Sequence, residues 1–592
     1  MRVRAVAIRN FRGIKTLDWS LSARLVCLVG AGDSGKSTVL DAISLALTPR
    51  FNVGFNDADF YGCDVEDPLT IDVTLTDLPL ELTIEDQFGL WLRGVADDDT
   101  VHDEPMADDQ PALTVRLMVD DSLEPTWTLF KEALAEVPRY IGARLRSAFG
   151  VFQVDDATSF HLRWSPGSAL SHLSGSTDVA AMLTLAHRQA RKAVFDSPLE
   201  SLKEGAEKAG EVLRALGGAA LDMPQPGLDP AGLGRGAALV LHDGLVPTTR
   251  LGSGSRRLAS RAFQLSALKE QSVVVIDEIE LGLEPHRLLH LLGVLRSRAS
   301  AGRGQVLLTT HSPQVIEAVT AEELHVVRRE GGTVVVRQVP KAIESLKATE
   351  PQATARSGPS AMLARRVVVC EGKTEVGLLR AMSTKWDSEQ QTPLALVGTA
   401  LRLGGGSEAP VKARCMATLG YPTALVIDDD LAKHDKSAFD TSVEAAVSAG
   451  VTVFQWATGM SIEQQIVMSL PDDGFSALVR LAAELLETED AERTICAAVG
   501  SRLDSVVLGG LDPMEWAEQS GRDLVDVRAA VGLTARNHLK GWFKDEARGE
   551  KLGKLILDYL TDIDHEDHLV VTLNSIRRFA YDVEEPPPIG SS

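Results

Sequence analysis

The sequence predicts a multidomain α/β protein, in which two different α/β domains, the first with a helical insertion, are followed by C-terminal helices. Three observations predict this fold class. An apolar run, Leu25–Val29, leads through a glycine-rich loop into a segment with apolar residues at helical spacing. Beyond residue 364, short apolar runs alternate with helical segments, which indicates a parallel sheet covered by helices. After Pro471 the apolar spacing is mainly that of helices.

The composition excludes several classes of protein. With 592 residues, 44% of them hydrophobic, the chain can form several domains with buried cores. Its formal net charge of −23 argues against unspecific coating of nucleic acid, although a local basic groove would still bind phosphates. The five cysteines include no C-x-x-C pair, which argues against a zinc module and a disulfide framework. Without a signal peptide or a membrane-spanning run, we expect a cytoplasmic protein with free thiols and no membrane contact.

The glycine-rich loop has the spacing of the Walker A motif, Gly-x-x-x-x-Gly-Lys-Ser, over residues 30–37. In such a loop, backbone N–H groups at the start of a helix cradle phosphates. We expect Lys36 to reach the β- and γ-phosphates of ATP and Ser37 to hold Mg²⁺. The predicted nucleotide-binding residues of the loop are Gly30, Gly32, Gly35, Lys36, Ser37 and Thr38.

Two later apolar runs end in chemically active residues. Ser272–Ile276 is a predicted buried strand that ends in Asp277 and Glu278, the Walker B arrangement. We expect Asp277 to hold the Mg²⁺ shell and Glu278 to polarise the attacking water. Gln305–Thr309 is another predicted strand, and His311 follows it closely.

The N-terminal sequence Ile-Arg-Asn-Phe-Arg-Gly-Ile over residues 8–14, followed by Walker A, resembles the start of the SMC, RecF and OLD group of ABC-type ATPases. The resemblance implies further parts. Leu251–Arg257 resembles a degenerate ABC signature loop, in which Ser253 and Gly254 would contact the γ-phosphate held by a second subunit. Leu281–His286 resembles the D-loop at the dimer interface, and His311 the switch histidine that senses the γ-phosphate.

Two features of this half stay open. The Q-loop glutamine of ABC-type ATPases has no clear equivalent, and Gln87, Asp57 and Asp59 are the alternatives. A long segment also separates the two Walker motifs, and its part from Ala169 to Leu216 has helical spacing, followed by a loop rich in glycine and proline up to Gly236. In the OLD family a helical insertion at this place mediates dimerisation, whereas a monomeric helical lid is the alternative.

In the second half, carboxylates follow the predicted strands. The predicted strands are Arg366–Cys370, Leu394–Val397, Thr423–Ile427 and Val451–Phe454. Glu371 and Glu375 follow the first of these, Asp428 and Asp430 follow the third, and Glu463 follows the fourth. Because the carboxyl ends of parallel strands meet at one edge of a sheet, these side chains should form a cluster of oxygen ligands, which suits Mg²⁺ or Mn²⁺.

The pattern E-G-x-x-E followed by D-x-D on a βα framework resembles the Toprim domain of topoisomerases, primases and OLD-type nucleases. The resemblance implies that Glu371, Glu375, Asp428, Asp430 and Glu463 hold one or two metal ions and that Glu371 is catalytic. OLD nucleases also carry a lysine after the Toprim core that steadies the scissile phosphate. Lys544, Lys551 and Lys554 are the candidates, and we favour Lys544.

The domain order resembles that of the OLD family over most of the chain. We predict an ABC-type ATPase in residues 1–168 and 237–340, a helical insertion in 169–236, a linker in 341–363, a Toprim core in 364–475 and a mainly helical extension in 476–592. The residues at 584–588 indicate a disordered tail.

The resemblance implies an ATP-regulated, metal-dependent DNA endonuclease that forms a homodimer or a higher homo-oligomer. Its bacterial members often act in antiviral defence, sometimes with a helicase-type protein partner, and a role in DNA repair is another reading. The alternative is an SMC- or RecF-like DNA-binding clamp or sensor with a degenerate Toprim domain. A topoisomerase would need a nucleophilic tyrosine on a separate domain, and a primase would usually carry a zinc finger.

Overall fold

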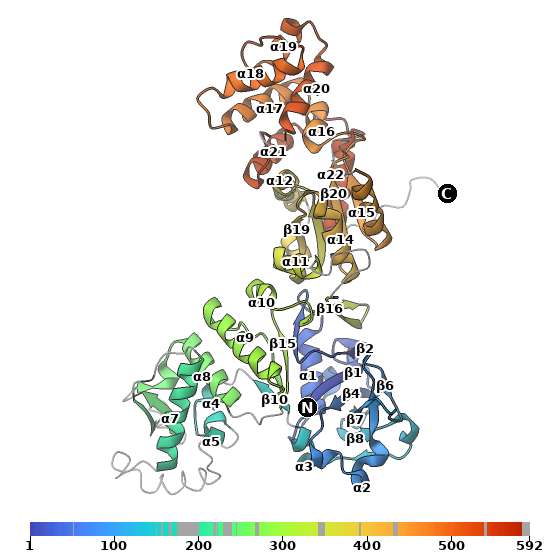
Figure 1. The fold of residues 1–592 in the computed structure, drawn as a ribbon, viewed down its shortest axis with the longest axis vertical. Helices are drawn as coiled ribbons and strands as arrows, with labels where there is room; N and C mark the ends of the chain where they lie inside the picture. The colour runs from blue at the N-terminus through green and yellow to red at the C-terminus, as the bar shows by residue number, and fades with distance from the viewer. Residues whose placement is uncertain are drawn as a thin grey trace. The chain divides into compact units, whose positions relative to one another are not determined.

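The structure is a computed structural model of the full chain. It describes all residues except 51–52, 150, 155–157, 165–167, 174–199, 217–220, 222, 229–238, 244–245, 267–271, 341–349, 390–391, 430–435, 538–540 and 583–592. The chain divides into two compact units, Met1–Val339 and Pro340–Ser592, and each is described by itself (Figure 1). The predicted tail at 584–588 lies outside the described residues.

One large mixed sheet organises the first unit. Its strand order in the described residues is β10-β14-β15-β3-β16-β17-β2-β1-β4-β7-β5-β6, and β8 and β9 continue from β7. The parallel part contains β10 (Val151–Val154), β14 (Val273–Ile276), β15 (Gln305–Thr309), β3 (Leu25–Val29) and β16 (Leu324–Glu330). The other strands are β17 (Thr333–Gln338), β2 (Ile14–Ser20), β1 (Arg2–Phe11), β4 (Leu69–Thr76), β7 (Gln110–Val119), β5 (Arg93–Val95), β6 (Val101–His102), β8 (Thr126–Phe130) and β9 (Arg139–Tyr140).

Sequence patterns explain the two parts of this sheet. β3, β14 and β15 are buried along their whole length, which is typical of parallel strands covered on both faces. β1 and β2 alternate between buried and more exposed residues, as antiparallel strands with one buried face do. The predicted strands and the predicted helix after Walker A are therefore present.

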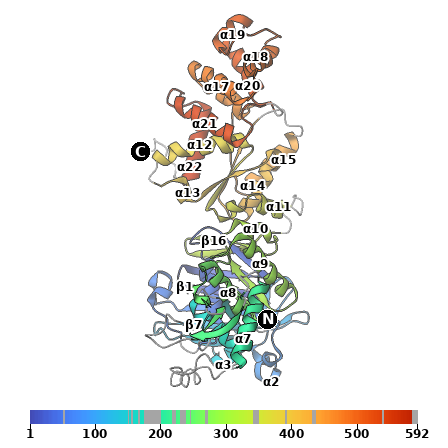
Figure 2. The ribbon, with the colours of Figure 1, turned by 90° about the vertical axis from the view of Figure 1, so that its left-hand side faces the viewer.

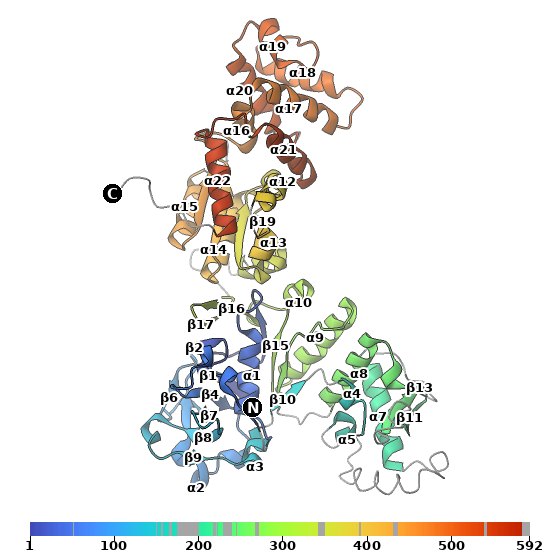
Figure 3. The same cartoon turned by 180° about the vertical axis from the view of Figure 1, so that it is seen from behind.

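Helices of the first unit lie beside the sheet and in a separate group. They are α1 (Lys36–Ala46), α2 (Glu85–Phe88), α3 (Ala143–Arg146), α4 (Thr158–His161), α5 (Ala169–Leu173), α7 (Glu200–Ala215), α8 (Ser253–Ser266), α9 (Pro285–Ser300) and α10 (Pro313–Ala318). α8 packs against α4, α5 and α7, and Figure 3 shows these helices gathered together. Within the predicted helical insertion, residues 169–236, α5 and α7 are helical, and residues 174–199 lie outside the described part.

The loop predicted at 217–236 contains a strand, which corrects the sequence reading. β11 (Pro224–Leu228) pairs with β12 (Leu239–Asp243), and β12 pairs with β13 (Val246–Pro247). Two prolines and a glycine in β11 hid this strand, because these residues are normally rare in sheets and occur at sheet edges. β11 is indeed an edge strand.

The second unit is built on a four-stranded parallel sheet with the order β19-β18-β20-β21. Its strands are β18 (Arg366–Cys370), β19 (Thr399–Leu403), β20 (Thr423–Ile427) and β21 (Thr452–Gln455). α12 (Lys373–Glu389) and α22 (His568–Tyr581) lie on one face, and α14 (Ala409–Thr418) lies on the other with α11 (Glu350–Ser357) and α15 (Lys436–Ser448), as Figures 1 and 3 show from opposite sides. This is the parallel sheet with helices on both faces that the sequence predicts.

The remaining helices extend the second unit. They are α13 (Leu394–Val397), α16 (Ile462–Ser469), α17 (Asp472–Leu485), α18 (Ala491–Arg502), α19 (Pro513–Ser520), α20 (Leu524–Ala535) and α21 (Glu546–Tyr559). Figure 2 shows α17, α18, α19 and α20 clustered at the end of this unit that lies away from its sheet. α21 returns to pack against α12. No helix in the described part of the chain is both long and apolar enough to span a membrane, and none of the five cysteines forms a disulfide.

Two predictions in this half were wrong. Leu394–Val397 is the helix α13 and not a strand, and β19 begins only at Thr399. Pro393 precedes this helical turn and Gly398, at φ 82°, ends it, so the apolar run is a single bounded turn. The predicted linker at 341–363 is also too long, because α11 forms inside it and buries Pro351 and Thr354.

Candidate functional site

The Walker A loop requires glycine at its start. Gly30 has a φ of 143°, and a Cβ at this position would lie 2.4 Å from the carbonyl oxygen of Val327 in β16. Gly35, at φ 99°, is the residue before α1. Both positions favour glycine because other residues rarely adopt these backbone angles. Gly32 lies in the exposed part of the loop, and Thr38 lies in the first turn of α1.

Lys36 is buried, and its side chain bonds back to the start of the Walker A loop. Its Nζ donates hydrogen bonds to the carbonyl oxygens of Gly30 at 3.0 Å and Ala31 at 2.7 Å. Burial lowers the pKa of Lys36 to about 8, although Asp277 acts in the opposite direction. The lysine is therefore held by neutral acceptors at the position where a phosphate would bind.

Asp277, which follows β14, accepts hydrogen bonds from α1 and from the neighbouring strand β15. Ser37 Oγ donates to Asp277 Oδ1 at 3.0 Å, and Thr309 Oγ1 donates to the same oxygen at 2.6 Å. The backbone N–H of Glu278 donates to Thr309 Oγ1 at 2.8 Å, while Glu278 itself has a φ of 47°. A hydroxyl and a carboxylate at this distance form a hard oxygen pair of the kind that Mg²⁺ prefers, so the predicted Mg²⁺ ligands fit the ion.

The predicted switch histidine and the predicted signature residues follow β15 and begin α8. His311 follows β15, and its side chain is exposed. Ser253 and Gly254 begin α8, and a Cβ on Gly254 would lie 2.9 Å from the carbonyl oxygen of Gly282 in the predicted D-loop. The structure thus places the start of α8 against the predicted D-loop of the same chain.

A glutamine that the sequence analysis missed lies beside this site. Gln153 is in β10, which pairs in parallel with β14, and it lies opposite Val275 just before Asp277. Its Nε2 donates to Asp41 Oδ1 of α1 at 3.5 Å, a long hydrogen bond. A glutamine in an apolar strand between the two Walker motifs was the available signal.

The three Q-loop candidates lie elsewhere. Gln87 is in α2. Asp57 and Asp59 belong to a short 3₁₀ turn, and Asp59 pairs with Arg12 at 3.0 Å. Of these residues and Gln153, Gln153 alone lies on a strand paired with β14, which precedes Asp277.

The carboxylates of the second unit meet at a topological switch point. β19 lies on one side of β18, and β20 and β21 lie on the other, so chain connections leave β18 and β20 in opposite directions. Ligand sites in open parallel sheets lie at such points, outside the carboxyl ends of the strands. Glu371 follows β18 and Asp428 follows β20, and the backbone N–H of Asp428 donates to Glu371 Oε2 at 3.0 Å.

Two buried glutamates and one lysine complete this carboxylate cluster, which we define as Glu371, Glu375, Asp428 and Glu463. Glu375 in α12 is 3% exposed, and Glu463 in α16 is 1% exposed. Lys544 Nζ lies 2.6 Å from Glu463 Oε1. Asp428 accepts from the N–H of Ile462 at 2.9 Å.

The charged groups of the cluster shift one another's pKa values. Burial, then the charges of Glu463 and Glu371, raise the pKa of Glu375 to about 7. Burial and the charges of Glu375, Glu463 and Glu371 raise the pKa of Asp428. Burial lowers the pKa of Lys544, but the attraction of Glu463 outweighs it and the net shift is upward.

The donor set fits a divalent cation, since it consists of carboxylates without histidine or cysteine. As the side chains stand, however, no three acidic, histidine or cysteine residues of the described part are placed to hold a metal ion. Asp430 lies outside the described residues. Asp429 turns away from the cluster, because it contacts Lys436 at 3.3 Å and the N–H of Gly459 at 3.0 Å.

Of the three candidate lysines, Lys544 faces the cluster. Lys551 is exposed, and Lys554 pairs with Glu550 at 3.2 Å. Thr374, in the first turn of α12, donates to the carbonyl oxygen of Phe543 at 2.8 Å and so fixes the backbone next to Lys544. This contact ties the segment of Lys544 to the helix that carries Glu375.

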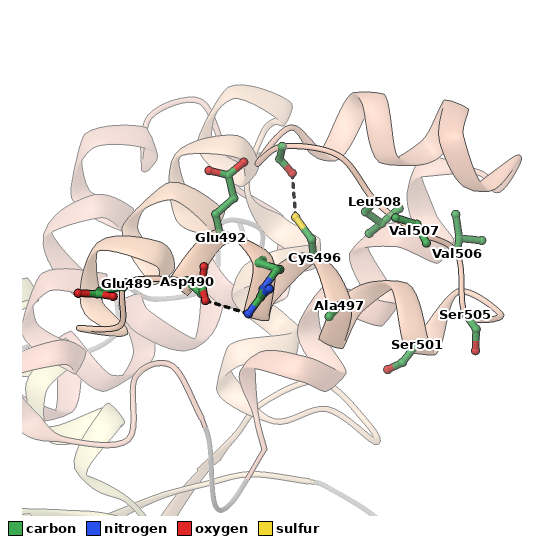
Figure 4. A pocket seen from close by; sticks show the side chains of 12 residues that line it. Glu489, Asp490, Glu492, Cys496, Ala497, Ser501, Ser505, Val506, Val507 and Leu508 are labelled. Atoms are coloured by element: carbon green, nitrogen blue, oxygen red, sulfur yellow. Dashed lines mark hydrogen bonds and ion pairs between the residues drawn. The ribbon is translucent and has the colours of Figure 1, made fainter.

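A hollow in the helical extension is separate from both sites. It has a volume of about 630 Å³ and lies beside α18, and no candidate site residue lines it (Figure 4). Asp490 pairs with Arg493 at 2.8 Å, and Cys496 Sγ donates to the carbonyl oxygen of Gly510 at 3.0 Å. Both contacts join residues that line the hollow.

Comparison with known proteins identifies the first unit only. Residues 25–317 match the family model described as "AAA domain, putative AbiEii toxin, Type IV TA system", which supports an ATPase domain in this part of the chain. A search of curated protein sequences found no match.

Solved structures that are similar to the chain include three SMC head domains. An SmcHead bound to the C-winged helix domain of ScpA is 13% identical, covers 57% of this chain and 97% of its own length, and has a TM-score of 0.36. The SMC head domain from Thermotoga maritima is 14% identical, covers 57% of this chain and 99% of its own, and has a TM-score of 0.29. The Smc head domain with an extended coiled coil, bound to a ScpA domain derived from Pyrococcus furiosus, is 13% identical, covers 57% and 96%, and has a TM-score of 0.34.

Proposed function

We propose that this protein is an ATP-regulated, divalent-metal-dependent DNA endonuclease of the OLD type, with a Toprim-like second unit, that acts as a homodimer or higher homo-oligomer. The main support for this proposal is the carboxylate cluster at the topological switch point of the second sheet, where Lys544 Nζ lies 2.6 Å from Glu463 Oε1. An ATPase domain precedes it in the same chain. Regulated cleavage of a phosphodiester requires both parts.

In the first unit, Lys36 would leave the carbonyl oxygens of Gly30 and Ala31 and bind the β- and γ-phosphates of ATP. Ser37 and Asp277 would hold Mg²⁺, and Gln153 on the neighbouring strand β10 would complete this set. Glu278 would accept the proton of the attacking water. His311 would bind the γ-phosphate, and Ser253 and Gly254 would reach the nucleotide of a second copy.

In the second unit, Glu371, Glu375, Asp428 and Glu463, with Asp430, would hold one or two divalent ions. Such ions activate water and stabilise the leaving oxygen in phosphodiester cleavage. Lys544 would then exchange its contact with Glu463 for the scissile phosphate. Its ammonium group would neutralise charge that develops on the phosphate.

Plasmid nicking with Mg²⁺ or Mn²⁺, with and without ATP, tests this proposal. We expect wild-type protein to nick and the Glu371→Ala and Asp428→Ala variants to lose cleavage. Glu484→Ala, which changes an exposed carboxylate of α17, should cleave like wild type. Cleavage that survives both cluster substitutions would contradict the nuclease assignment.

The second candidate is an ATP-dependent DNA-binding clamp or sensor. The ion pair between Lys544 and Glu463 favours it, because Lys544 then neutralises Glu463 without a metal ion. This function predicts DNA binding that depends on ATP and on Lys36, without cleavage under any metal.

A further inference from the structure

We propose that Glu280 is a positioning residue for the switch histidine, and that its carboxylate fixes the backbone of His311 to the turn after Asp277 and Glu278. The inference deepens the ATPase part of the proposed function and does not depend on the nuclease part. Glu280 belongs to neither Walker motif, and its side chain was not among the predicted site residues.

Both carboxylate oxygens of Glu280 are used. Oε1 accepts from the backbone N–H of His311 at 2.5 Å, and Oε2 accepts from Thr310 Oγ1 at 2.7 Å. Thr310 is fully buried and in turn accepts from the N–H of Ser312 at 3.0 Å. One carboxylate therefore holds three consecutive residues of the switch segment, two directly and one through Thr310.

The turn that carries Glu280 is itself held firmly. The N–H of Leu283 donates to the carbonyl oxygen of Glu280 at 2.9 Å, and the N–H of Ile279 donates to that of Thr309 at 3.1 Å. Arg261, which is 3% exposed in the signature helix α8, donates to the carbonyl oxygens of Ile279 at 2.5 Å and Glu278 at 3.1 Å. The backbone of Glu280 is thus fixed by hydrogen bonds to the residues before and after it.

This arrangement matters because the imidazole of His311 is exposed, and the structure gives it no hydrogen-bond partner among the described residues. Its position relative to a bound phosphate then depends on its backbone. A hydrogen bond from a backbone N–H to an ionised carboxylate is roughly twice as strong as one between neutral groups. Displacing a positioned catalytic group by about 1 Å can lower a rate by about 10²-fold.

Steady-state ATP hydrolysis by the full chain tests the inference. We expect Glu280→Ala to lower kcat by about 10²-fold and to change KM less than about twofold, because Glu280 holds His311 and not the nucleotide. Glu280→Gln keeps an acceptor and should recover part of the loss. Glu330→Gln, an exposed glutamate at the end of β16, is the matched control and should behave like wild type.

A double-mutant cycle with Thr310→Val sharpens the assignment. Since Thr310 and Glu280 act on the same segment, the combined loss in kcat should be clearly smaller than the product of the two single losses. Independent, multiplicative losses would contradict a shared clamp.

Hydrogen exchange of the segment 305–316 gives a readout that needs no enzymatic activity. Glu280→Ala should speed exchange in this segment and leave the other segments of the first unit unchanged. Unchanged protection of the segment, or a kcat within about twofold of wild type, would overturn the proposal. If the wild-type chain hydrolyses no ATP, the ATPase function is wrong, whereas the exchange result still decides the role of Glu280.

Discussion

Lys36 in the first unit and Lys544 in the second both have an ammonium group surrounded by oxygens, but the oxygens differ in charge. Lys36 contacts neutral carbonyls, and burial lowers its pKa to about 8. Lys544 contacts the carboxylate of Glu463, and the net shift of its pKa is upward. The first lysine therefore lacks an anion that ATP would supply. The second already has one, for which a bound metal ion would have to compete.

The largest expected effect concerns Lys36, the lysine of the first unit in this comparison. Lys36→Met should weaken ATP binding by about 10³-fold, because two charge-assisted hydrogen bonds to phosphate, each about 1.5–3 kcal/mol, are lost. Equilibrium titration with a fluorescent ATP analogue measures it. Lys15→Met, at an exposed lysine of the same unit, should bind like wild type, and equal affinities for all three proteins would show that Lys36 does not reach the phosphates.

A second prediction compares how the stability of the two units depends on pH. Burial lowers the pKa of His325 to about 4, and its usual value is 6.5. Between these values the unfolded chain binds the extra proton, so the stability of the first unit should fall by about 2–3 kcal/mol as the pH drops from 6.5 to 4. Glu375 has its pKa raised to about 7, so the same acidification should favour the folded second unit.

Urea unfolding at several pH values measures this effect in wild type and in His325→Phe. The substitution keeps an aromatic ring against Trp19 but removes the titrating group. The loss of stability between pH 6.5 and 4 should shrink in the variant, and an identical pH profile would show that another group is responsible.

A third prediction concerns the competition at Lys544. Lys544→Met should tighten Mn²⁺ binding to the second unit by about tenfold, because the ammonium group no longer competes for Glu463; tenfold corresponds to about 1.4 kcal/mol. Titration followed by electron paramagnetic resonance measures it. Lys551→Met on α21 is the control, and weaker Mn²⁺ binding in Lys544→Met would mean that the lysine supports the ion rather than replacing it.

The smallest expected effect comes from Ser461, which caps α16 and donates from Oγ to Glu463 Oε2 at 3.0 Å. Ser461→Ala should destabilise the second unit by about 1 kcal/mol, the usual value for a lost N-cap. Chemical denaturation followed by circular dichroism measures it. Ser448→Ala at the end of α15 should stay within about 0.5 kcal/mol of wild type, and an equal loss there would point to a general surface effect.

Sequence patterns predicted most strands and helices because their apolar runs have clear periods and clear ends. The four apolar residues at 394–397 were wrongly predicted to be a strand, because a run this short fits either a strand or one helical turn. Only the flanking Pro393 and Gly398 distinguish the two. α11, which packs against α14, was missed because its eight residues contain no apolar run.

The candidate site was only partly predictable for a different reason. Strand ends indicated where Asp277, Glu371 and Asp428 would lie, because topology fixes those positions. The contacts of Gln153 and Glu280 depend on which strands become neighbours, and that information is not local in the sequence. Lys544 lies far along the chain from Glu463, so only its chemistry, and not its distance, could be anticipated.

The central claim is that the carboxylate cluster binds a divalent ion. Mn²⁺ binding to the full chain without nucleotide, measured by electron paramagnetic resonance in wild type, Asp428→Ala and Ser37→Ala, tests it most directly. The account predicts a bound ion in wild type and in Ser37→Ala that is lost in Asp428→Ala. Equal Mn²⁺ occupancy in all three proteins, or none in wild type, would contradict it.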